Sequence, residues 1–203
     1  VVTLAYFVIC PLLSVGGSFL GKLMLPVKHN ANYLSELGWA ASLITFLLVI
    51  LGGLVTSNEA GLAVPDWPNT YEENMFLYSL MQMDGQVFYE HTHRLFGSLV
   101  GLCTFILAIA VFRARKSKLS RFFVVFLLVF VGAQGILGGV RVTAADLPMD
   151  AADRPLDSSV ALFLAFLHGI CGQLFLACLV GYTATLGARP SIVTAAEKAV
   201  ERL

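Results

Sequence analysis

Charged residues are scarce in this chain of 203 residues, and the scarcity decides its broad class. Only 13% of the residues are charged, against about 25% in soluble domains, and 58% are hydrophobic. The formal net charge is zero and no long basic tract occurs, which excludes the usual basic surface for nucleic acid. Cysteine is also rare, and all four cysteines fall inside apolar runs: Cys10, Cys103, Cys171 and Cys178. Buried thiols are therefore expected rather than exposed disulfides.

The start of the chain lacks the pattern of a signal peptide. The first residue is Val1 rather than Met, and no charged segment precedes the first apolar run. We therefore expect the chain to begin within a longer protein.

What the sequence has in abundance is long apolar runs without Asp, Glu, Lys or Arg. Five of them occur: Val1–Gly21, Leu37–Thr56, Leu95–Phe112, Phe122–Val140 and Val160–Leu186. A bilayer core needs roughly 20 apolar residues of helix. The sequence therefore predicts an all-α polytopic membrane protein. Residues 31–190 would form a four-helix transmembrane bundle, residues 1–30 one extra transmembrane helix with its inner link, and residues 191–203 an inner-side tail.

Basic residues indicate which ends of these helices face inward. The link 113–121 holds five basic residues and no acid, and Lys22 and Lys28 lie between the first two runs. By the positive-inside rule both links face the cytoplasm or the mitochondrial matrix. The loops around residues 66–84 and 143–159 are richer in acids, so they are predicted to face outward.

Histidines occur at two predicted spans. His91 and His93 open the third span in the stretch YEHTHRLFG, and His168 lies within the last. Ionisable residues are costly in a bilayer, so they indicate function. Residues three or four apart share a helical face, so Glu90, His93 and Arg94 cluster while His91 points elsewhere. A rise of about 1.5 Å per residue brings His93 and His168 to similar depths.

Two inward histidines on different helices commonly hold haem by axial ligation of the iron. We therefore predict His93 and His168 as haem ligands, with His91 as the alternative to His93 if the helix is rotated or begins later. Arg94 could pair with a haem propionate, because guanidinium matches carboxylate geometry. Zinc or copper would need further ligands that the spacing does not offer. Glycines along the spans predict close helix packing: Gly52, Gly53, Gly97, Gly101, Gly132, Gly135, Gly138, Gly139, Gly169 and Gly172.

Three motifs in order resemble the haem A synthase family: GGLVTS…GLAVPDWP…TY from Gly52 to Tyr71, EHTHRLFGSLVG from Glu90, and LHGICGQ from Leu167. The likeness covers about Leu37 to Leu186. The family has eight membrane helices in two similar halves. The resemblance implies that this chain is the amino-terminal half. It also implies oxidation of the C8 methyl group of haem O to the formyl group of haem A, in support of cytochrome oxidase assembly.

The resemblance also assigns residues and partners. Glu90, His93 and His168 map to the family's haem site, and Arg94 follows the same motif. Glu90 would act as the catalytic base or acid, although from the residues alone a surface cap at a helix start is the expectation. Haem O is the implied substrate, and haem b belongs to the second half, which this sequence lacks. The implied partners are the lipid bilayer, haem O synthase and either a carboxy-terminal half or a fused upstream domain.

The sequence departs from the family pattern in two places, and two alternative functions remain. The first outer loop lacks the cysteine pair of many bacterial members, and Val1–Gly21 matches nothing expected at its position. One rival is a bis-histidine b-type cytochrome that passes electrons in the membrane and needs neither Glu90 nor the VPDWP loop. The other is a transporter or assembly module with structural histidines. Because the sequence of the first outer loop resembles that of bacterial members of the family, a bacterial inner (plasma) membrane is predicted, with the haem site toward the outer side.

Overall fold

The computed structural model describes residues 33–115, 117–145 and 158–187. This part of the chain holds four helices long and apolar enough to cross a membrane: α2 (Tyr33–Ser57), α3 (Gly85–Ala114), α4 (Lys118–Ala145) and α5 (Ser158–Gly187). A single 3-10 turn, η1 (Leu80–Gln82), precedes α3. The all-helical class and the last four predicted spans are confirmed. The extra helix predicted within residues 1–30 and the tail 191–203 lie outside the described residues.

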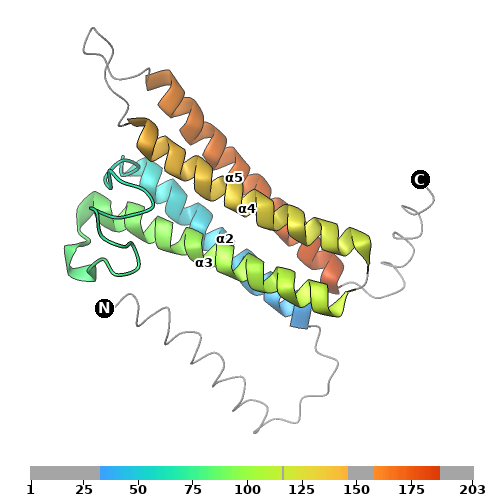
Figure 1. Ribbon diagram of the computed structural model, residues 1–203. Coiled ribbons are helices and arrows are strands. Elements are labelled where there is room, and N and C mark those ends of the chain that lie inside the picture. Colours follow the sequence, from blue (N-terminus) through green and yellow to red (C-terminus); the bar gives the residue numbers. More distant parts are fainter. Residues whose placement is uncertain (1–32, 116, 146–157, 188–203) are drawn as a thin grey trace.

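The four helices form a bundle in which chain neighbours are also neighbours in space. Helix α2 packs against α3 and α5, and α4 packs against the same two helices (Figure 1). The loop 58–84, which joins α2 to α3, lies over one end of the bundle. We call the adjoining part (residues 45–57, 85–99, 130–145 and 158–172) the loop half. The remainder (33–44, 100–114, 118–129 and 173–187) is the far half.

Large apolar side chains fill the far half. Every member of the buried apolar cluster lies there: Leu34, Ala41, Val100, Leu107, Ala108, Val111, Val124, Leu127, Phe175, Leu179, Tyr182 and Leu186. Polar contacts tie the helix ends together beneath this cluster. The Ser120 and Tyr182 hydroxyls lie 2.9 Å apart, and Arg115 Nη2 donates to the Leu186 carbonyl at 3.0 Å. The far half is therefore a closed and well-packed helix junction.

Helix α3 begins ten residues before the apolar run that predicted it, at Gly85 instead of Leu95. The added segment is rich in polar side chains, which a hydropathy pattern does not assign to a membrane helix. The two charged side chains among them, Glu90 and Arg94, bond to one another and to the loop 58–84. The helix therefore extends beyond the apolar run.

The sequence predicted close helix contact at all of the glycines named above, but the structure shows it at only some of them. At Gly52, Gly138 and Gly139 a β-carbon would press on a neighbouring side chain. The other glycines of the predicted set behave differently. A β-carbon would meet nothing within 4 Å at Gly53, Gly97, Gly101, Gly132, Gly135 and Gly169. Close packing was therefore the wrong reading for these six, which have open space beside them.

Candidate functional site

His93 from α3 and His168 from α5 face each other in the loop half of the bundle. Their ring centroids are 6.3 Å apart, and the ring planes are nearly perpendicular, at 80°. Nδ1 of each ring is buried without a hydrogen-bond partner. The Nδ1 edge of the His93 ring lies toward Gly52 and the Leu48 backbone of α2, and that of His168 lies toward Gly138 and the Gln134 backbone of α4. The two histidines predicted to face one another across the bundle therefore do so.

Four glycines surround this histidine pair in a matched arrangement. Gly52 of α2 lies against His93, and Gly138 of α4 lies against His168, where a β-carbon would stand 3.1 Å and 3.3 Å from the respective Cε1 atoms. One helical turn further along α3, Gly97 has open space beside it, and Gly172 occupies the same position on α5 relative to His168. Each imidazole is thus contacted by a glycine of the neighbouring helix, and the glycine one turn further along its own helix adds no side chain beside it.

Glu90 and Arg94 clamp the loop 58–84 onto α3. Arg94 Nη2 donates to Glu90 Oε1 at 2.6 Å, and the Val64 N–H donates to Glu90 Oε2 at 2.9 Å. Arg94 also donates to the carbonyls of Val64, Asp66 and Asn69 at 2.9, 2.6 and 3.0 Å. Glu90 is only 4% exposed, so it is not the surface helix cap that the residues alone suggested. The predicted propionate contact of Arg94 stays a prediction, and the guanidinium is already bound to four oxygens.

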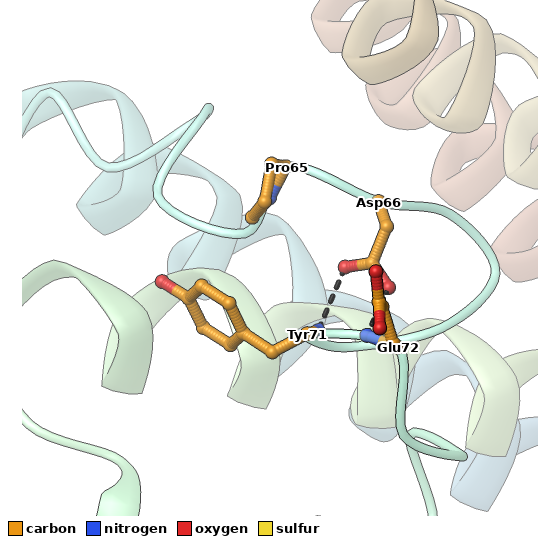
Figure 2. Close-up of a pocket in the computed structure, with 4 residues that line it drawn as sticks. All are labelled: Pro65, Asp66, Tyr71 and Glu72. Carbon is orange, nitrogen blue, oxygen red and sulfur yellow. Dashed lines mark hydrogen bonds between the residues drawn. The ribbon is translucent and has the colours of Figure 1, made fainter.

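The clamped loop is also ordered by its own side chains. The Asp66 carboxylate accepts hydrogen bonds from the backbone N–H groups of Tyr71 (2.8 Å) and Glu72 (2.7 Å), and the Tyr71 hydroxyl donates to the Ala63 carbonyl at 2.6 Å. Figure 2 shows Asp66 and Tyr71, which with Pro65 and Glu72 line an open surface pocket. Both carboxylate oxygens of Asp66 are occupied by the turn. The Asp66 carboxylate in this pocket therefore serves to order the loop.

His91 points away from the facing pair, into the base of the loop. It is fully buried, its Nδ1 lies 3.0 Å from the Thr70 hydroxyl, and its ring packs 5.2 Å from that of Tyr78. Burial also raises the pKa of Tyr78 above its ordinary value, so this phenol stays neutral near pH 7. The geometry thus brings His93, and not His91, opposite His168.

Two contacts between the loop and α4 were missed by sequence reasoning. The Trp67 indole lies over Gly139 and the Arg141 guanidinium lies against Gly61, each so close that a β-carbon on the glycine would overlap it. Trp67 therefore packs on α4 with part of its ring, and the rest is exposed. A signal for Arg141 was present, because it is a basic residue within the last turns of an apolar helix, where charges are costly.

Comparison with known proteins agrees with the motifs. The cytochrome oxidase assembly protein family, COX15-CtaA, matches residues 35–203. The chain belongs to this family. Haem A synthase of Parvibaculum lavamentivorans is 27% identical over 140 residues, covering 55% of this chain and 40% of that protein. Haem A synthases of Listeria monocytogenes and Listeria innocua are 30% identical over 105 residues, covering 51% of this chain and 33% of theirs.

The chain spans 33–40% of the length of the curated COX15-CtaA relatives it matches. No solved structure matches it. The family and the four apolar helices together make the protein an integral membrane protein of the COX15-CtaA family.

The histidine pair fits a haem better than it fits a bare metal ion. A metal–imidazole bond of about 2 Å on each side, plus roughly 1 Å from each nitrogen to its ring centre, gives about 6 Å between ring centres. The observed 6.3 Å agrees with this sum. Within the described residues no group of three or more His, Cys, Asp or Glu side chains is placed to hold a metal ion. Two imidazoles alone suit an iron whose other ligands come from a porphyrin.

Proposed function

We propose that His93 and His168 hold a haem iron in the loop half of this bundle. We further propose that the chain acts in haem A biosynthesis by oxidising the C8 methyl group of haem O to the formyl group of haem A, a four-electron oxidation in which water supplies the oxygen and an external electron acceptor takes the electrons. The observation that supports this best is the pair of partly buried imidazoles from two helices that face each other with 6.3 Å between ring centres. When bound, the haem supplies a redox-active iron and the methyl group to be oxidised.

In this proposal Glu90 supplies a fixed negative charge beside the site. It precedes His93 by three residues on α3, so the two side chains lie on neighbouring parts of one helical face. Oxidation of a methyl group develops positive charge, which a nearby carboxylate stabilises, and the same carboxylate orients water or takes up a proton. A carboxylate accepts about four hydrogen bonds, so the bonds from Arg94 and Val64 leave acceptor capacity for this task.

The loop 58–84 keeps water from the site in this scheme. It is clamped to α3 by Glu90 and Arg94 and contacts α4 through Trp67 and Arg141. A covered, low-dielectric site strengthens the electrostatic effect of each buried charge. The distribution of basic residues directs this end of the bundle outward across a bacterial inner membrane.

The first test is a reduced-minus-oxidised optical spectrum of the purified protein, with extracted haem identified by chromatography, beside His93→Ala and His168→Ala. We expect a b-type band in the wild type that both variants lose, with haem O or haem A in the extract. Haem b alone would favour the electron-transferring cytochrome, and a band retained in both variants would exclude this histidine pair as ligands.

Two Glu90 variants separate its charge from its structural contacts. Glu90→Gln keeps one acceptor oxygen, enough for either the Val64 N–H or Arg94, so part of the clamp is retained and we expect haem to bind but haem A to be absent. Glu90→Ala removes the acceptor as well and should also loosen the loop. Haem A made by Glu90→Gln at the wild-type level would contradict a catalytic role and leave Glu90 as part of the clamp.

A further inference from the structure

Two arginines lie at the loop end of the histidine pair, and they differ in what their guanidinium groups bind. Arg94 donates to four oxygens of the protein, so Nε is its one nitrogen without a hydrogen bond within the described residues. Arg141 of α4 has no hydrogen bond or ion pair within the described part of the chain. A half-buried cation without a partner is costly in a membrane protein, which indicates that an anion belongs beside it.

The position of Arg141 relates it directly to the histidines. It follows Gly138 by three residues on α4, so it lies on the same helical face, about 4.5 Å nearer the loop end at 1.5 Å per residue. Gly138 is the residue against which His168 packs.

The loop prevents this guanidinium from turning away. Gly61 lies so close to it that no β-carbon could stand there, and Trp67 covers Gly139, two residues before Arg141 on the same helix. An arginine near a helix end ordinarily extends its charge toward the lipid headgroups. Here its charged group lies against the backbone of the loop instead.

We propose that Arg141 binds a carboxylate of the ligand held between His93 and His168, and that it is the propionate anchor of this site. This inference rests on the proposed haem site. A planar guanidinium forms two parallel hydrogen bonds with a carboxylate, which fixes orientation as well as affinity. Arg141 thereby sets which edge of the porphyrin faces the loop, while Arg94 keeps its structural bonds to the loop.

The test compares two ligands that differ only at the propionates, iron protoporphyrin IX and its dimethyl ester. Binding of each to the purified wild type and to Arg141→Gln is titrated optically. We expect Arg141→Gln to bind iron protoporphyrin IX at least tenfold more weakly, since a hydrogen bond to a charged group is lost. Both proteins should bind the dimethyl ester with the same affinity. Arg141→Lys should recover part of the loss.

Three further measurements distinguish loss of the Arg141 contact from a general effect on the protein. Arg113→Gln, which removes an exposed cation at the other end of the bundle, should leave both affinities unchanged. Gly61→Ala retains Arg141 but displaces its guanidinium, so it should reproduce the selective loss. The midpoint potential of the bound iron should fall in Arg141→Gln, because a positive charge near the iron stabilises the reduced form.

The results distinguish failure of the haem site from failure of the propionate contact alone. Wild-type protein that binds neither ligand would overturn the haem site itself, and this inference with it. Wild-type protein that binds both ligands, with Arg141→Gln losing affinity equally for the two or for neither, would overturn the propionate contact alone and leave the haem site standing.

Discussion

The two halves of the bundle are built from the same four helices but packed by opposite means. In the far half, apolar side chains from all four helices meet in one buried cluster that includes Leu107, Leu127 and Leu179. In the loop half, that cluster is absent from the described residues, and glycines, two histidines and an ion pair stand in its place. Membrane helices associate mainly by van der Waals packing. The far half therefore holds the bundle together, and the loop half is the part to which we assign the proposed ligand.

The largest effect should come from removing the charge that holds the loop. Arg94→Gln leaves Glu90 buried without its cation, a loss of about 3–5 kcal/mol for a buried pair. We expect the loop 58–84 to open, measured as faster amide hydrogen exchange across it, while the far half stays protected. Arg113→Gln is the matched control and should exchange like the wild type. Unchanged protection in Arg94→Gln would show that the loop is held by its contacts with α4 instead.

The next prediction fills the open space of the loop half. Gly97→Leu should weaken haem binding by about 2–3 kcal/mol, up to roughly a hundredfold, because the added side chain occupies the ligand's volume beside His93. Gly181 in the far half also has open space beside it, so Gly181→Leu is the matched control with the same added volume. An optical titration of both variants with haem measures the difference. Equal affinities would contradict a ligand space at Gly97.

The converse experiment removes volume from the far half. Leu179 is fully buried, and Leu179→Ala should lower the stability of the bundle by about 2 kcal/mol through the cavity it leaves. Haem affinity, measured at a temperature where the variant is folded, should match that of the wild type. A parallel loss of haem affinity would mean that the two halves are mechanically coupled and that their separate roles are overstated.

The difference between the two halves of the bundle could be predicted only in part from the sequence. Helix positions followed from hydropathy, because four runs of suitable length lack charges. The facing of His93 and His168 followed from depth along two helices that enter from the same side. The clamp did not follow, because its partners are backbone groups at Val64, Asp66 and Asn69, and no side-chain pattern encodes a carbonyl acceptor.

The glycines also show a limit of prediction from sequence. Small residues in membrane helices predict close contact, but sequence cannot tell a glycine that admits a neighbour from one that is exposed, as Gly53, Gly132, Gly135 and Gly169 are. That distinction depends on how neighbouring helices are rotated. Arg141 was overlooked for a related reason: its importance comes from Gly61 and His168, which are distant in sequence and adjacent only after folding.

The smallest predicted effect tests how tightly the histidine is held. A β-carbon at Gly52 would lie 3.1 Å from His93 Cε1, a contact so close that the imidazole must shift by a few tenths of an ångström. Gly52→Ala should therefore cost about 1 kcal/mol in haem binding, less than tenfold in affinity, with a small shift of the reduced band. Gly53, the next residue, has open space, so Gly53→Ala should bind haem as the wild type does. If both variants behaved alike, a general change in α2 would explain the result. A loss confined to Gly52→Ala would show that the loop half, loosely packed as a whole, is tight at the ligand itself.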